Sequence, residues 1–148
     1  MKNLNLKSIG YALLNFVQLA IIVVVFVIQY LTNKKAGVMH HVYYRKYQYE
    51  NSIFSPENLQ TQKMISIVIT ILLLALFIYI IKKRNTNFFK IQVGIAEILS
   101  IILYVVISGE YFASKLAYHY FIMAFALVLM IQIFIVILSY FLEFKYKR

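Results

Sequence analysis

The sequence predicts an all-α integral membrane protein, a bundle of four transmembrane helices with short turns and one extracytoplasmic loop of about 30 residues. Hydrophobic residues make up 63% of the 148 residues and charged ones only 14%, which is too apolar for a soluble domain. Four apolar runs are each long enough to cross the ~30 Å hydrocarbon core of a bilayer, and cations mark their ends. Lipid cannot satisfy an open strand edge, so we expect helices in a single membrane domain over residues 1–148.

The first apolar run predicts a helix over about residues 9–31, closed by Lys34 and Lys35. Lys2 and Lys7 before this run give the segment some likeness to a secretory signal peptide. The run is longer than the apolar part of a typical signal peptide, and no convincing small-residue cleavage site follows it. We therefore expect it to remain as a spanning helix.

A polar loop is expected over residues 32–62. At its centre, aromatic rings alternate with cationic side chains, a composition that suits the bilayer–water interface or contact with another protein. This composition makes the loop the candidate surface for recognition on the outer face. Its candidate residues are His40, His41, Tyr43, Tyr44, Arg45, Lys46, Tyr47 and Tyr49.

The other three helices are expected over about residues 56–82, 90–110 and 115–142. Ser55, Pro56 and Glu57 together form a helix-start signal, with serine as N-cap, proline at the first helical position and an acid at the positive end of the helix dipole. A helix that starts there runs about 40 Å, at ~1.5 Å per residue, before it ends. Its first turns should therefore stand outside the bilayer.

The distribution of cations predicts the orientation. Nine Lys and Arg residues fall on the side of the N-terminus, the C-terminus and the short turn at residues 82–90, and six fall on the other side. The positive-inside rule then places both termini in the cytoplasm and the chain in the cell membrane as a multi-pass protein. The formal charge of +10 is spread over the ends of the apolar runs, which indicates contact with anionic lipid head groups and not with nucleic acid.

The intramembrane polar residues form the second candidate site, because Glu97 is the only carboxylate inside one of the four apolar runs. We expect Glu97 to lie at a depth similar to that of the amides of the first and last helices. Two stripes should face inward, one through Asn15, Gln18, Ile22, Val25 and Gln29 and one through Glu97, Ser100, Tyr104 and Ser108. The predicted cluster is Asn15, Gln18, Glu97, Ser100 and Gln132.

Two interpretations of this cluster remain open. In the first, the amide and carboxyl groups hydrogen-bond between helices and only stabilise their packing, at ~0.6–2 kcal/mol each. In the second, the cluster is a proton or cation site in which Glu97 titrates.

Several kinds of chemistry have no support in the sequence. The chain has no cysteine, so disulfides, thiolate metal sites and thiol redox chemistry are excluded. Phosphate-binding glycine loops, Gly-x-Ser-x-Gly elbows and His-Glu-x-x-His motifs are absent, and we predict no cofactor, no metal and no catalysis. The three histidines at positions 40, 41 and 119 all fall on the predicted outer face, where an interfacial role is expected over a metal site.

The favoured hypothesis is a small polytopic protein that binds a membrane partner without catalysis, as an accessory subunit or an immunity-type protein, or that forms a homo-oligomer. The alternative is a small oligomeric transporter or channel with Glu97 as the residue that couples ions or protons. A third hypothesis is a lipid-modifying enzyme that uses His40, His41 or His119 as acid or base.

Overall fold

Six helices follow one another along the chain in the computed structural model, which describes residues 2–82 and 86–146, with side chains described for 9–82 and 86–141. Four of them are long and apolar enough to cross a membrane, and no strand occurs in these two ranges. The predicted fold class, an all-α bundle of four transmembrane helices, is therefore confirmed. The helices are α1 (Lys2–Lys34), α2 (Ala36–Glu50), α3 (Pro56–Lys82), α4 (Asn87–Ser108), α5 (Glu110–Ala113) and α6 (Tyr118–Tyr146).

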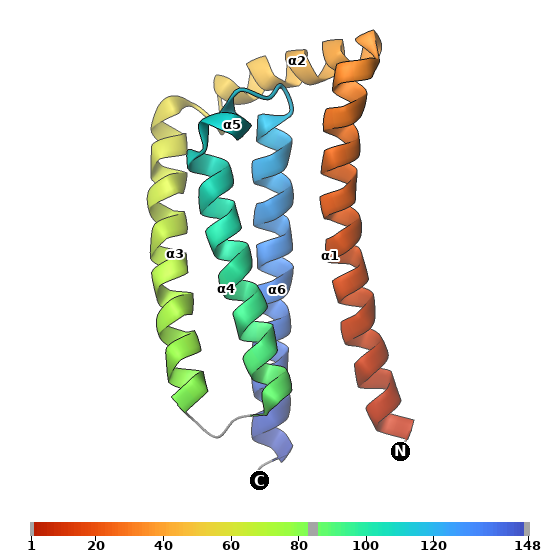
Figure 1. The fold of residues 1–148 in the computed structure, drawn as a ribbon, viewed down its shortest axis with the longest axis vertical. Helices are drawn as coiled ribbons and strands as arrows, with labels where there is room; N and C mark the ends of the chain where they lie inside the picture. The colour runs from red at the N-terminus through yellow and green to blue at the C-terminus, as the bar shows by residue number, and fades with distance from the viewer. Residues whose placement is uncertain (1, 83–85, 147–148) are drawn as a thin grey trace.

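The four long helices stand side by side in the order α3, α4, α6, α1, and α2 lies across one end of them (Figure 1). The two chain termini lie at the opposite end (Figure 1). We call these the α2 end and the termini end of the bundle. These names do not say which end of the bundle faces the cytoplasm.

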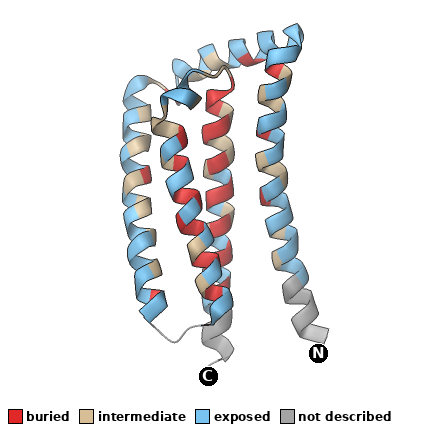
Figure 2. Ribbon diagram, viewed as in Figure 1, coloured by how far each residue is buried: buried red, intermediate tan, exposed pale blue. Residues whose placement is uncertain are grey.

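Burial concentrates on α4 and α6, as Figure 2 shows. In the most apolar stretch of each span, 39% of the residues are buried in α4 and in α6, against 11% in α1 and in α3. The reason is that α4 packs against both α3 and α6, whereas α1 packs against α6 and α2. Most of the surface of α1 and α3 is therefore left for lipid, which suits their apolar residues.

The largest apolar core lies toward the α2 end, where α1, α2, α4 and α6 meet. Val42 and Phe54 enter it from the α2 side and are 2% and 4% exposed. The hydroxyl of Tyr118 donates a hydrogen bond of 2.7 Å to the backbone oxygen of Ile107, which fixes the start of α6 against the end of α4. A smaller core joins α3, α4 and α6 near the termini end.

The segment 32–62 corrects our expectation of a polar loop. Residues 36–50 form helix α2, and α3 begins at Pro56. The physical reason is a helical stripe through Val38, Val42 and Tyr49, whose buried or half-buried side chains pack on the core. The helix start at Pro56 is confirmed, because the backbone N–H of Asn58 donates to Ser55 Oγ at 3.4 Å.

The helix ends also differ from the predicted ranges by a few residues. The first helix begins at Lys2 and the last begins at Tyr118, after the short helix α5. Some of the cations used to predict orientation lie outside the described residues or have side chains that are not described: Lys2, Lys7, Lys83, Arg84, Lys145, Lys147 and Arg148.

Candidate functional site

A chain of three glutamine amides crosses the bundle between α1, α6 and α4. Gln18 Nε2 donates to Gln132 Oε1 at 2.9 Å and to the backbone oxygen of Val128 at 3.3 Å. Gln132 Nε2 in turn donates to the side-chain and backbone oxygens of Gln92, both at 2.9 Å. All three side chains are buried, at 7%, 0% and 3% exposure for Gln18, Gln132 and Gln92. We call Gln18, Gln132 and Gln92 the amide chain.

The three glutamines share one level in the bundle. Each lies 14 to 16 residues from the α2 end of its helix, or about 21–24 Å at ~1.5 Å per residue. Gln92 is not among the predicted residues, because it stands near the predicted start of its helix. A usable signal was present, since Gln92, Ala96 and Leu103 follow a helical stripe of buried residues.

Asn15 does not join the amide chain, and its predicted place in the cluster is wrong. Its side chain is exposed, although it precedes the buried Gln18 by three residues. Helix α1 buries only a narrow stripe, which runs through Gln18, Val25 and Thr32. By the helical angle of ~100° per residue Asn15 is 60° from this stripe, which is far enough to leave its side chain exposed.

Glu97 is buried but has no part in the amide chain. It is 6% exposed, and neither carboxylate oxygen has a hydrogen-bond partner among the described residues. It stands ten residues after Asn87 and eleven before Ser108, in the middle of α4. Ser100, which was predicted beside it, uses its hydroxyl to donate to the backbone oxygen of Glu97 at 2.8 Å.

The structure thus divides the predicted cluster in two. The amides form an interhelical hydrogen-bonded chain, as in the packing interpretation, whereas the carboxyl group of Glu97 is separate. The other residues of its stripe do face inward, since Ser100 is buried and Tyr104 and Ser108 are half-buried.

Helix α2 presents a row of exposed side chains away from the bundle. His40, Tyr43, Tyr44 and Tyr47 follow the spacing i, i+3, i+4, i+7 and lie on one face, which we call the α2 stripe. Tyr43, Tyr44 and Tyr47 are 60%, 57% and 65% exposed. The flanking His41 and Arg45 are also exposed.

Two of the residues predicted for recognition belong instead to the inner side of α2. Tyr49 is half-buried, with its ring centroid 5.9 Å from that of Phe54 and 6.4 Å from that of Tyr120. Lys46 is half-buried and pairs with Glu50 at 3.7 Å. Tyr49 packs α2 onto the bundle, whereas Lys46 pairs within α2 itself, and both are less exposed than the other residues of the predicted outer-face set.

His119 lies under this attachment and not at the surface. It is 2% exposed, and its ring centroid is 4.9 Å from that of Phe54 and 5.3 Å from that of Tyr118. Neither ring nitrogen has a hydrogen-bond partner among the described residues. In residues 9–82 and 86–141, no three His, Asp or Glu side chains lie close enough to hold a metal ion.

Comparisons with protein-family models, with curated proteins and with solved structures find no match to this chain.

Proposed function

We propose that this membrane protein acts by binding a membrane partner through the α2 stripe, as an accessory subunit or an immunity-type protein, without catalysis. The observation that carries the proposal is the row of three tyrosines, each more than half exposed, on a helix anchored to the bundle by its opposite face. Tyrosines supply large contact areas at a small entropic cost and are enriched among the residues that dominate protein interfaces.

The anchoring of α2 supports this function because it holds the stripe in place before binding. Val42 is 2% exposed in the core, and Tyr49 packs on Phe54 and Tyr120. A surface that is already ordered loses less conformational entropy when a partner binds. The exposed Arg45 and His41 beside the stripe favour a partner with acidic or aromatic groups at the membrane surface.

For the orientation we propose that both termini are cytoplasmic and that α2 lies on the outer face of the cell membrane. The support is the excess of Lys and Arg in the segments on the termini side, nine against six. A partner would then meet the α2 stripe from outside the cell or within the outer half of the bilayer.

The test is cross-linking and pull-down of the tagged full-length chain from the membranes of its own host. A Tyr44→Ser/Tyr47→Ser variant should lose the cross-linked partner. The matched control is Tyr30→Ser/Tyr140→Ser, since these two tyrosines are 61% and 54% exposed but lie outside α2. An identical set of cross-linked proteins in the wild type and the α2 variant would refute the proposal.

A second candidate function, a small oligomeric transporter or channel, is favoured by one observation. Glu97 is a buried carboxyl group without a hydrogen-bond partner in the described structure, in the middle of a span. Ionisable residues at such positions are frequently part of ion pathways. Flux of protons or cations into liposomes should then fall in Glu97→Gln, and equal flux in the two proteins would remove this candidate.

A further inference from the structure

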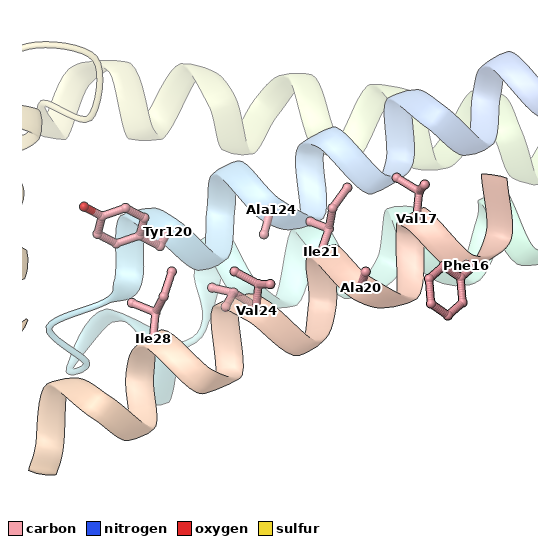
Figure 3. Close-up of a pocket in the computed structure, with 9 residues that line it drawn as sticks. Phe16, Val17, Ala20, Ile21, Val24, Ile28, Tyr120 and Ala124 are labelled. Carbon is pink, nitrogen blue, oxygen red and sulfur yellow. The ribbon is translucent and has the colours of Figure 1, made fainter. Parts of the chain in front are cut away.

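An apolar groove of about 390 Å³ lies between α1 and α6 (Figure 3). Its volume is within the range of about 300–1,000 Å³ that is typical of small-molecule sites. Phe16, Ala20, Val24 and Ile28 of α1 line it together with Tyr120 and Ala124 of α6. The groove exists because α1 packs on α6 along a narrow stripe and small residues, Ala20 and Ala124, stand where the two helices face each other.

The groove matches one leaflet of a bilayer in length. From Phe16 to Ile28 the chain advances 12 residues, or about 18 Å at ~1.5 Å per residue. Half of the ~30 Å hydrocarbon core is about 15 Å. The α1 span runs from Ile9 to Lys34, so the groove crosses its middle, and Tyr120 and Ala124 of α6 line only the part nearer α2. An acyl chain of a lipid in the leaflet on the α2 side fits the groove if it enters at this end and reaches the middle of the span.

The end of the groove nearest α2 carries polar groups that suit an anionic head group. Tyr120 lies at this end (Figure 3). Tyr49 of α2 places its ring centroid 6.4 Å from that of Tyr120, and the exposed Arg45 stands one helical turn before Tyr49. Lys34 and Lys35, also exposed, follow at the end of α1. Guanidinium and phenol groups are both good donors to phosphate oxygens.

We propose that the groove between α1 and α6 is a binding site for one anionic phospholipid, with an acyl chain along α1 and the phosphate between Tyr120 and Arg45. This site is distinct from the α2 stripe and goes beyond the proposed function. Charge complementarity selects this occupant. The acyl chain takes the apolar lining, and the cations at the mouth take the negative head group.

The test uses phosphatidylglycerol and phosphatidylcholine that each carry a photoreactive diazirine in an acyl chain, in phosphatidylcholine vesicles that contain the full-length protein. The phosphatidylglycerol probe should label peptides of residues 16–28 and 120–124, which line the groove. It should label them about fivefold more than the phosphatidylcholine probe, the preference expected from one Arg near the membrane surface.

Two pairs of variants separate the acyl chain from the head group. Ala20→Leu/Ala124→Leu fills the groove and should reduce the labelling roughly tenfold, the equivalent of about two methylene groups of lost burial. Ala12→Leu/Ala75→Leu, on exposed faces of α1 and α3, is the matched control and should not change it. Arg45→Gln should lower the preference for phosphatidylglycerol, with Lys34 and Lys35 retaining part of it, whereas Lys63→Gln on α3 should leave it unchanged.

Equal labelling by the two probes, or labels spread evenly over all four spans, would overturn the proposal. Unchanged labelling in the filled variant would do so as well. If that variant does not fold, the map of labelled peptides in the wild type still decides. Tyr44→Ser/Tyr47→Ser should leave the lipid labelling unchanged, so failure of the lipid site and failure of partner binding are separate results.

Discussion

The side-chain nitrogen of Gln132 lies 2.9 Å from both the backbone oxygen and the side-chain oxygen of Gln92. This pair joins α6 to α4 at the level where Gln18 joins α1 to α6. Gln132 is 0% exposed and acts as donor and acceptor at once. The side-chain hydrogen bonds that join α1, α6 and α4 at this level therefore depend on one amide.

Replacement of that amide should destabilise the bundle. We expect Gln132→Leu to lower the free energy of unfolding by about 1–3 kcal/mol, because the amide groups of Gln18 and Gln92 would stay buried without their partner. Unfolding in mixed micelles with increasing SDS, followed by circular dichroism, measures the change. The control is Met130→Leu, at a side chain 64% exposed, and a stability of Gln132→Leu equal to that of this control would contradict the prediction.

A second prediction concerns the contact of α4 with α3 at Gly94. A Cβ atom at this position would lie 3.3 Å from Cε2 of Phe77. We expect Gly94→Leu to cost about 1–3 kcal/mol of stability through overpacking. Phe77→Ala in the same chain should recover part of the loss. Gly10→Leu is the control, since nothing lies within 4 Å of a Cβ there, and equal effects at positions 94 and 10 would show that the close approach is absent.

His119→Phe should stabilise the protein. Both ring nitrogens lack partners in the described structure while aromatic rings surround the side chain, so a phenyl ring loses no hydrogen bond and removes a buried polar group. We expect a gain of about 1 kcal/mol in the same SDS titration. His40→Phe, at an exposed position, should change the stability by less than about 0.5 kcal/mol. A marked loss in His119→Phe would mean that the imidazole has a polar partner in the folded protein.

Glu97→Gln should likewise raise stability. Neither carboxylate oxygen accepts a hydrogen bond from the described residues, and an ionised group in the middle of a span is costly. A neutral amide of nearly the same size should therefore increase the free energy of unfolding at neutral pH by about 1–3 kcal/mol. Glu110→Gln, at an exposed position after α4, serves as the control. If Glu97→Gln proves less stable than the wild type, the Glu97 carboxylate has a polar partner in the membrane that is not among the described residues.

Local composition was enough to predict the membrane spans, because the length and hydropathy of one run decide whether it can cross a bilayer. The prediction of Ser55 as an N-cap also depended only on neighbouring residues, and the hydrogen bond from the Asn58 backbone N–H to Ser55 Oγ confirms it. The low hydropathy of residues 36–50 predicts a loop in place of helix α2, although Val38, Val42 and Tyr49 form a helical stripe.

It was harder to predict which polar side chains are buried and which of them pair with one another. Asn15 and Gln18 belong to one helix at the same depth range, yet one is exposed and the other buried. Which of the two faces inward depends on the rotation of α1 against α6, and that rotation follows from long-range packing. For the same reason Gln92 could not be assigned to Gln132 from sequence spacing, since 40 residues separate them.

The hydrogen bond from Gln18 to Gln132 spans 114 residues of sequence. Ribosomes add about 5–20 residues per second, so the first helix resides in the bilayer for roughly 6–23 seconds before its acceptor is synthesised. During that interval the Gln18 amide needs a substitute, such as a chaperone, the insertion machinery or another nascent chain. Packing of α1 in the bundle thus waits for α6, and truncation before α6 would leave α1 without its membrane neighbour.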